Sequence, residues 1–504
     1  MITLVNPTLP YGFAKRNGVI LLDAGDIAVV GLRDGADPLA LVETRRALGR
    51  PLQVQAMAQA EFDRRLSDVY AGDLNAAGDQ QMEMPSGLDG LIEDLPAAAD
   101  LLDSADDAPV IRMINGIIAE AVRAGASDIH LEPYESALVV RMRVDGVLRE
   151  SLSLNPRITP LLVSRIKVMA RLDIAEKRVP QDGRIPLALG GKTLDVRVST
   201  LPSRAGERVV LRILDKDQAD LRLEDLGMDP VALDAFRHAL REPNGIILVT
   251  GPTGSGKTTS LYAGLSLLND ATRNILTVED PVEYAIDGVG QTQVNPKVGM
   301  TFAAGLRAIL RQDPDVVMVG EIRDVETASV AVQASLTGHL VLSTVHTNDA
   351  AGAVTRLRDM GVEPFLLAST LRLIVAQRLV RRLCGECRRS EPADAATARL
   401  SGVAQGATVW RAQGCGSCNH TGYVGRVGVY ETLKIDDKVR RLIAAEADED
   451  ALVAAAFPQG GSLSDRARGL VLAGVTSVEE AVRVTRQETP EAHPLPEPAL
   501  GSAA

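Results

Sequence analysis

Four short apolar runs, separated by stretches with helical periodicity, dominate the second half of the chain. They span residues 245–251, 274–280, 315–321 and 338–346, and each is rich in β-branched residues. Runs that are apolar on both sides of the pleat are typical of parallel strands covered by helices on both faces. The pattern therefore predicts an α/β domain with a mostly parallel sheet between residues 226 and 487.

A different pattern occupies residues 108–218. It begins with apolar residues at near-helical spacing: Ile111, Ile114, Ile118 and Val122. Val140, Met142 and Val144 then alternate with Arg141, Arg143 and Asp145, the period of a half-buried strand. A second helical segment, 161–176, precedes two further predicted strands, 194–202 and 207–215. We predict a compact α+β domain here.

A long acidic stretch separates this domain from the N-terminus. No Lys or Arg occurs between Arg65 and Arg112, whereas Asp, Glu and Pro are frequent there. Such a segment repels itself and resists compaction, so we predict a flexible linker over 79–107 and a small separate domain over 1–78. The last residues, 488–504, lack periodicity and are predicted to be a disordered tail.

Composition disfavours two classes of protein, those that bind nucleic acid and those that span a membrane. The 504 residues carry a net charge of -12, which suits a nucleic-acid backbone poorly. No apolar run is long enough to span a membrane, and the N-terminus lacks a secretory pattern, so we expect a cytoplasmic protein.

The strongest motif is a phosphate-binding loop. The first apolar run leads into Gly251-Pro-Thr-Gly-Ser-Gly-Lys-Thr258, which fits the G-x-x-x-x-G-K-[ST] pattern in full. Its glycines allow backbone N–H groups to surround phosphates at the start of a helix. We expect Lys257 to reach the β- and γ-phosphates of ATP and the hydroxyl of Thr258 to ligate Mg²⁺. The predicted nucleotide contacts are Gly251, Pro252, Thr253, Gly254, Ser255, Gly256, Lys257, Thr258 and Thr259.

Other polar residues also follow the apolar runs. Glu321 comes two residues after Val319, a place suited to orienting the attacking water or to holding Mg²⁺ through water. Glu279, Asp280 and Glu283 follow a second run, and His339 and His346 flank a third. Taken alone, each histidine is more often structural than catalytic.

Four segments in this order resemble the Walker A, Asp box, atypical Walker B and His box of the secretion ATPase superfamily. They are 251–262, 278–284, 319–324 and 337–350, and 125–133 with 141–150 resemble the domain that precedes the ATPase. The resemblance implies a RecA-like P-loop ATPase domain after a PAS-like α+β domain. It also implies that Glu321 is the catalytic acid and that Glu279, Asp280 and His346 line the site. The positions matching the family's nucleotide-binding arginines are Arg197, Arg212, Arg307 and Arg311.

The N-terminal segment Leu9–Asp23 resembles that of the type II secretion branch, the general secretion pathway protein E family. This resemblance implies a homo-hexamer that docks through its first domain on the cytoplasmic part of an inner-membrane L-type protein. The motor would act on an inner-membrane F-type platform protein, drive pseudopilus assembly and remain peripheral to the membrane.

All four cysteines form two C-x-x-C pairs: Cys384 with Cys387, and Cys415 with Cys418. Two such pairs are typical of a closed, structural Zn²⁺ site, here within an insertion over 384–422. A redox pair would need no second copy. The neighbouring basic residues predict a local positive patch: Arg378, Arg381, Arg382, Arg388 and Arg389.

Three alternatives remain at this stage. One is the type IV pilus assembly ATPase, a near relative. Another is a hexameric nucleic-acid translocase, which the net charge of -12 and the 3% aromatic content disfavour, so no nucleic-acid partner is expected. The third is a nucleotide-binding regulator with slow hydrolysis.

Overall fold

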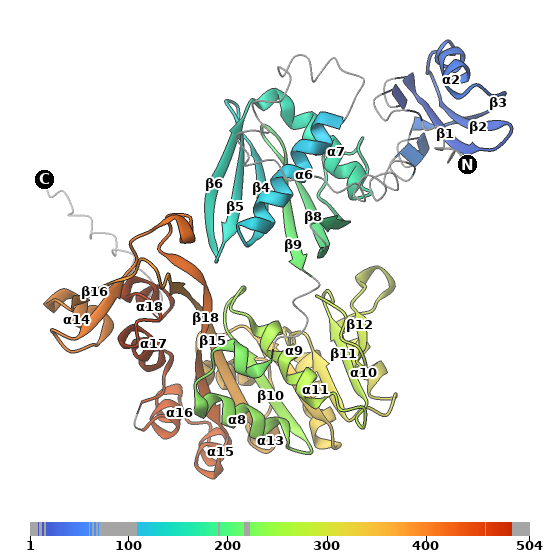
Figure 1. Cartoon of the computed structure of the whole chain (residues 1–504). Helices are drawn as coiled ribbons and strands as arrows, with labels where there is room; N and C mark the ends of the chain where they lie inside the picture. Colours follow the sequence, from blue (N-terminus) through green and yellow to red (C-terminus); the bar gives the residue numbers. More distant parts are fainter. Residues whose placement is uncertain are drawn as a thin grey trace, which may run out of the picture. The chain divides into compact units, whose positions relative to one another are not determined.

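A computed structural model of the chain describes residues 9, 13–14, 17–59, 61–62, 65–66, 69, 108–189, 192–215, 222–458 and 460–485. The predicted linker, 79–107, and the predicted tail, 488–504, lie outside these residues. The chain divides into two compact units, Met1–Gln218 and Ala219–Ala504, which are described separately (Figure 1).

The larger unit is built on a seven-stranded sheet with the order β12-β11-β13-β14-β10-β15-β18. The four predicted strands are confirmed as β10 (Gly245–Thr250), β11 (Ile275–Glu279), β13 (Val316–Val319) and β14 (Leu340–Val345). Neighbouring strands are parallel except for the last pair, β15 and β18. The edge strand β12 covers Gly290–Gln293.

Helices cover both faces of this sheet, which explains the uninterrupted apolar runs. On one face α8 (Pro230–Leu240) and α9 (Lys257–Leu268) contribute to a core with Ile247 and Val249 of β10. On the other face Ile246 and Leu248 join a second core with α10 (Phe302–Ile309), α11 (Val325–Leu336) and α12 (Ala350–Asp359). The antiparallel pair of strands in this sheet comes after α13 (Pro364–Thr370) in the chain.

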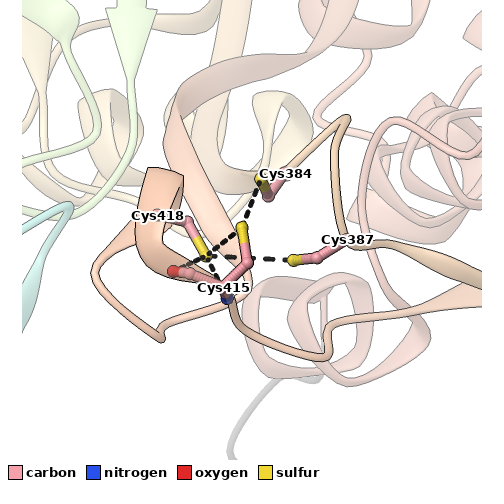
Figure 2. A group of neighbouring side chains, drawn as sticks. All are labelled: Cys384, Cys387, Cys415 and Cys418. Carbon is pink, nitrogen blue, oxygen red and sulfur yellow. Dashed lines mark hydrogen bonds between the residues drawn. The ribbon is translucent and has the colours of Figure 1, made fainter.

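Two long strands complete the sheet and were not among the predicted ones. β15 (Leu371–Leu383) and β18 (Tyr423–Lys434) pair antiparallel and run side by side in Figure 1. Between them lies a small module with the hairpin of β16 (Arg389–Pro392) and β17 (Thr408–Arg411), and α14 (Ala395–Ser401). The four cysteines gather at the base of this module (Figure 2).

Four short helices follow the sheet. They are α15 (Asp437–Ala444), α16 (Glu449–Ala456), α17 (Leu463–Leu472) and α18 (Val478–Thr485). Asp436, Asp448 and Ser462 begin the first three of these helices by accepting backbone N–H groups with their side chains. Such caps satisfy donors that the first turn leaves unpaired, so the sequence itself fixes where these helices start.

The smaller unit contains a six-stranded antiparallel sheet with the order β6-β5-β4-β9-β8-β7. Its strands are β4 (Ala126–Pro133), β5 (Leu138–Val144), β6 (Val147–Leu154), β7 (Gln181–Leu189), β8 (Lys192–Ser203) and β9 (Gly206–Asp215). Two helices, α6 (Ala108–Arg123) and α7 (Thr159–Met169), pack with the apolar positions of the strands in one core. The alternate positions of the strands therefore form a second, largely charged face.

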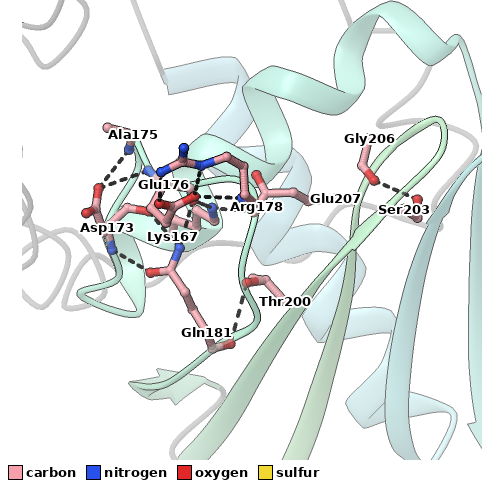
Figure 3. Close-up of polar contacts among 10 residues, drawn as sticks. All are labelled: Lys167, Asp173, Ala175, Glu176, Arg178, Gln181, Thr200, Ser203, Gly206 and Glu207. Atoms are coloured by element: carbon pink, nitrogen blue, oxygen red, sulfur yellow. Dashed lines mark hydrogen bonds and ion pairs between the residues drawn. The ribbon is translucent and has the colours of Figure 1, made fainter.

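A buried ion pair fixes the loop between α7 and β7 (Figure 3). The side chain of Lys167 is 1% exposed, forms an ion pair with Glu207 and donates to the carbonyl oxygen of Glu176 at 2.7 Å. Gln181 donates to the same carbonyl at 2.9 Å, and Asp173 accepts two backbone N–H groups of the loop. The loop 173–181 is thus held from both of its ends.

The N-terminal residues form a three-stranded sheet of β1 (Val19–Ala24), β2 (Ala28–Arg33) and β3 (Leu52–Met57). β1 and β2 are antiparallel, while β2 and β3 are parallel and are joined through α2 (Ala40–Leu48). Among the residues described in the whole chain, no helix combines the length and the apolar character that a membrane crossing requires.

Candidate functional site

The phosphate loop connects the carboxyl end of β10 to the first turn of α9. Gly251 has a φ of 146°, and a Cβ at this position would lie 2.4 Å from the carbonyl oxygen of Gln377 on β15. Gly254 and Gly256 have φ values of 79° and 86°, which glycine adopts without strain. The glycines of the motif are therefore required by the backbone path and by its close approach to β15.

Two side chains of the loop are directed toward its interior. Lys257, 9% exposed, donates from Nζ to the carbonyl oxygens of Gly251 at 2.8 Å and Pro252 at 3.1 Å. Burial lowers the pKa of Lys257 below its ordinary value, and the negative charge of Glu321 opposes that shift. Ser255 is 3% exposed, and its hydroxyl has no hydrogen-bond partner in the described part of the chain. An ammonium and a spare hydroxyl donor fit phosphate oxygens.

Glu321 is held from two sides just beyond the carboxyl end of β13. One carboxylate oxygen lies 2.5 Å from a guanidinium nitrogen of Arg323, and the other lies 3.3 Å from Nε2 of His346. The Glu321 side chain is 12% exposed, whereas that of His346 is 46% exposed. The hydrogen bond to Glu321 raises the pKa of Arg323. The structure thus brings Glu321 and His346 together, as the sequence motifs imply.

Adjacent strands position these groups, because β13, β14 and β10 are neighbours in the sheet. Ligands of open α/β sheets bind beyond the carboxyl ends of the strands, where the phosphate loop, Glu321 and His346 all lie. Thr250, at the end of β10, bonds to the hydroxyl of Thr347 at 2.7 Å and accepts its N–H at 2.9 Å. This bond ties the start of the phosphate loop to the segment that carries His346.

Glu279 and Asp280 face different surroundings although they are consecutive. Glu279 is 2% exposed and accepts hydrogen bonds from Tyr262 of α9, from Thr277 and, at 3.1 Å, from Gln291. Burial and the Glu279 charge raise the pKa of Tyr262. Asp280 is exposed, and its charge contributes to the raised pKa of Arg323. Of this pair, Asp280 is the residue whose charge acts on Arg323, the partner of Glu321.

Sequence reasoning missed two residues of β15 that contact the phosphate-loop region. Gln377 accepts a hydrogen bond from Ser260 at 2.8 Å, and Arg378 donates to the carbonyl oxygen of Asn348 at 2.7 Å. Burial lowers the pKa of Arg378, and its charge in turn lowers that of Lys257. The only sequence signal was a polar Gln-Arg pair in an otherwise apolar stretch.

The other residues predicted for the nucleotide site are more exposed or make structural contacts. Pro252, Thr253, Gly254 and Thr258 are exposed, and Thr259 is partly exposed. Arg307 of α10 pairs with Glu326 of α11 at 2.6 Å, and Arg311 is exposed just after α10. His339 bonds through Nδ1 to the carbonyl oxygen of Ala334 at 2.8 Å, the contact of a structural histidine.

Arg197 and Arg212 belong to the smaller unit. They are direct partners in the register of β8 and β9, on the charged face of the six-stranded sheet. Their flanking residues Val196, Val198 and Leu211 are buried in the core on the opposite face, as alternation predicts. Arg212 donates from Nε to Asp128 at 2.9 Å.

The four cysteines have the geometry of a metal site. Their sulfur atoms all lie within 4.8 Å of one another, with distances of 3.9 Å for Cys384–Cys415, 3.8 Å for Cys387–Cys418 and 3.7 Å for Cys415–Cys418. A tetrahedron with Zn–S bonds of about 2.3 Å has edges of about 3.8 Å. The cysteines are free thiols and come from the two segments that Figure 2 shows meeting.

Backbone N–H groups support thiolates at this cluster. Cys418 accepts from the N–H of Cys415 and of Gly422, both at 3.2 Å. Although burial opposes the shift, these donors lower the pKa of Cys418 to about 6. Burial raises the pKa of Cys387 to about 11. A group of this kind is compatible with Zn²⁺.

Three of the five arginines in the predicted basic patch make internal contacts, whereas Arg382 and Arg389 are exposed. Arg378 faces the phosphate-loop region, and Arg381 pairs with Glu480 at 2.8 Å and lies 4.0 Å from the ring centroid of Tyr423. Arg388 stacks on Trp410 at 4.5 Å and donates to the carbonyl oxygen of Gly474. The predicted patch is therefore reduced to Arg382 and Arg389, since the other three arginines are used for internal contacts.

Comparison with known families gives two matches. The profile of the type II/IV secretion system protein family matches residues 103–483, and that of the first N-terminal domain of GSPII protein E matches residues 8–70. The second match supports the type II branch over the pilus assembly and translocase alternatives.

Curated relatives cover nearly the whole chain. Type II secretion system protein E of Pseudomonas aeruginosa is 56% identical over 484 residues, 95% of this chain and 96% of the relative. Type II secretion system ATPase E of Vibrio cholerae is 54% identical over 487 residues, 95% of this chain and 97% of the relative.

Solved structures share the fold. The ATPase DotB of Legionella pneumophila has a TM-score of 0.56 at 22% identity, covering 74% of this chain and 95% of DotB. The pilus retraction motor PilT with bound ADP has a TM-score of 0.50 at 27% identity, covering 74% of this chain and 96% of PilT. The predicted α/β ATPase fold is confirmed.

Proposed function

Because this chain belongs to the type II/IV secretion system protein family, we propose that it is a type II secretion ATPase in which Glu321 activates the attacking water. The observation that carries the proposal is the meeting of the phosphate loop, Glu321 and His346 at the carboxyl ends of adjoining strands. The enzyme hydrolyses ATP, as its relatives' names and its fold indicate.

Each residue has a distinct part in this chemistry. Backbone N–H groups of 251–256 and the ammonium of Lys257 bind the β- and γ-phosphates. Glu321 accepts a proton from water, while Arg323 and His346 hold its carboxylate in place from two sides. Glu279 acts at a distance, because it fixes Tyr262 and thereby the helix that follows the phosphate loop.

The residues present fit a nucleotide with its metal. The hydroxyl of buried Ser255, which has no partner among the described residues, and the exposed hydroxyl of Thr258 are side-chain oxygens available near the phosphates. Mg²⁺ would be ligated by Thr258 and would neutralise charge on the phosphates when bound. Arg197, Arg212, Arg307 and Arg311 are proposed to contact the nucleotide as well.

Family membership supports a proposal for the wider assembly. We assign the first domain to docking on an inner-membrane L-type protein, and the working form to a homo-hexamer that acts on an F-type platform protein. In this arrangement the chain stays cytoplasmic and is attached to the inner membrane through partners. Zn²⁺ at Cys384, Cys387, Cys415 and Cys418 has a structural role, since four thiolates leave no open position.

Two variants test the site. Glu321→Gln keeps the shape of the side chain but removes the base, so steady-state ATP turnover should fall by roughly 10²–10⁴-fold while nucleotide affinity changes little. Lys257→Ala should instead weaken nucleotide binding itself. Both are measured by phosphate release and by equilibrium binding of a fluorescent ATP analogue.

Glu391→Gln is the matched control, because Glu391 also pairs with an arginine, Arg411, in the hairpin of the cysteine module. It should hydrolyse ATP at the normal rate. Normal turnover by Glu321→Gln would refute the role proposed for Glu321.

A further inference from the structure

A row of charged side chains crosses five strands of the six-stranded sheet. The register pairs Arg184 with Arg197, Arg197 with Arg212, Arg212 with Asp128, and Asp128 with Arg143. All five lie on the face opposite α6 and α7, because their neighbours along the strands contribute to the core. Asp128 is the only acid in this row.

Asp128 is enclosed and fully engaged. It is 6% exposed, and one carboxylate oxygen accepts from Nε of Arg212 at 2.9 Å. The other oxygen accepts from the hydroxyl of Ser127 at 2.8 Å and lies 3.8 Å from Nε of Arg143. Although burial opposes the shift, these hydrogen bonds lower the pKa of Asp128 below its ordinary value.

The nitrogen that Asp128 uses decides what Arg212 can do. A guanidinium has two edges suited to bidentate contact, and a bond at Nε leaves the edge formed by the two terminal nitrogens for another partner. The Arg212 side chain is 58% exposed, so this edge is accessible to an anion from outside the domain. A flexible arginine side chain without such a contact would lose more entropy when it binds.

We propose that Asp128 is a positioning residue for Arg212, which it holds at Nε so that the terminal nitrogens meet the nucleotide phosphates. This inference rests on the proposed role of Arg212 in ATP hydrolysis and names the residue that prepares it.

Glu132 offers a built-in comparison on the same strand. It is 2% exposed and accepts from Tyr134 at 3.1 Å and from Arg141 at 2.6 Å, and it also pairs with Arg208. Both of these arginines use a terminal nitrogen for the carboxylate. Glu132 thus contacts the terminal nitrogens of its arginines, whereas Asp128 leaves the terminal nitrogens of Arg212 available. The two acids are similarly buried.

The test compares kcat and KM for ATP in full-length Asp128→Ala, Asp128→Asn and Glu132→Gln proteins, with and without Arg212→Ala. Displacement of a positioned group costs roughly 10²-fold in rate, so Asp128→Ala should lower kcat by about 10- to 100-fold with little change in KM. Asp128→Asn keeps an acceptor for Nε and should retain more activity. Glu132→Gln should keep the normal kcat even where it lowers the thermal transition of the domain.

The double variant separates positioning from general stability. Residues that act as one unit are not additive, so Asp128→Ala should have no further effect on kcat in the Arg212→Ala background. A normal kcat in Asp128→Ala, an additive effect in the double variant, or an equal loss in Glu132→Gln would each overturn the inference. A normal kcat in Arg212→Ala alone would instead remove the proposed role of Arg212 itself.

Discussion

Glu279 and Asp280 illustrate how much a single position along a strand decides. Glu279 is the last residue of β11, and its buried side chain accepts a hydrogen bond from Tyr262 of α9. Asp280 follows the strand, and its charge helps to raise the pKa of Arg323, the residue that contacts Glu321. The sequence motif predicts that both residues line the nucleotide site. Their surroundings differ, because Glu279 supports the structure from within the core and Asp280 lies near the proposed catalytic group.

The arginines of the smaller unit carry a residue-scale prediction. Replacing Arg197 and Arg212 together by Ala should lower ATP turnover steeply with little loss of nucleotide affinity, because arginines that stabilise developing phosphate charge contribute roughly 10³–10⁵-fold in other NTPases. The effect of each single change should be smaller, since two arginines share the charge. Single-turnover kinetics and nucleotide binding are the measurements.

Lysine variants at the same positions provide the control for charge alone. Lys keeps the positive charge but lacks the planar fork of donors, so Arg197→Lys and Arg212→Lys should restore little activity. Arg204→Ala, which removes an exposed arginine paired with Glu135, should leave turnover unchanged. Full activity in the double Ala variant with an intact oligomer would contradict the role proposed for this face.

The sequence offers candidate site residues where backbone motifs mark them, but it gives no sign of residues that approach the site only through tertiary contacts. The glycines and Lys257 were predicted from the loop pattern and Glu321 from its place after an apolar run, whereas His346 was predicted only from the resemblance to the secretion ATPases. Gln377 and Arg378 approach the phosphate loop only because β15 pairs with β10, a pairing between segments more than a hundred residues apart. No local pattern reports such a contact.

At the scale of elements, the strands that were predicted differ physically from those that were missed. β10, β13 and β14 are buried at every position, so their sequences are continuous apolar runs. β15 contains arginines at 372, 378, 381 and 382, and these positions are only partly buried or exposed. Its polar positions are satisfied by long-range partners such as Glu480, which obscures the strand pattern.

The cysteine module carries the element-scale prediction. Purified protein should contain one Zn²⁺ per chain by elemental analysis, and Cys415→Ser should lose most of it. Structural zinc supplies on the order of 10–16 kcal/mol of apparent binding energy in small modules. Hydrogen exchange should therefore accelerate within 384–422 and remain unchanged in peptides of the phosphate loop.

Ser417→Ala, between the second pair of cysteines, is a suitable control because it keeps all four sulfur ligands. It should retain the metal and normal exchange. Protein that is isolated without zinc under metal-replete conditions would rule the site out.

At the scale of the whole molecule, charge is unevenly distributed. Residues 108–218 contain 18 Lys and Arg against 13 Asp and Glu, in a chain whose net charge is -12. The domain with the arginine row is thus basic, and the rest of the chain carries the acidic excess. This distribution favours an anionic partner, such as a nucleotide, for that domain. It also explains why the net charge of the whole chain did not indicate a basic domain.

The N-terminal domain carries the prediction at this scale. Deleting residues 1–78 should leave ATP hydrolysis possible, because none of the proposed site residues lies there, but should detach the protein from membranes. Membrane fractionation of cells that contain the complete secretion system measures this. Full-length Glu321→Gln is the control and should stay attached; unchanged attachment of the truncated protein would refute the docking role.

The enclosure of Lys167 and Glu207 has a consequence for the response to salt. Dissolved ions screen exposed charges beyond about 10 Å at 0.1 M ionic strength but affect buried pairs much less. The Lys167–Glu207 pair, 1% and 7% exposed, therefore holds the loop 173–181 at any ordinary ionic strength. The attraction proposed between exposed Arg212 and phosphate should weaken as salt is added. Under the role proposed for Arg212, rising salt should weaken its contact with the nucleotide while the shape of the domain that presents the arginine stays the same.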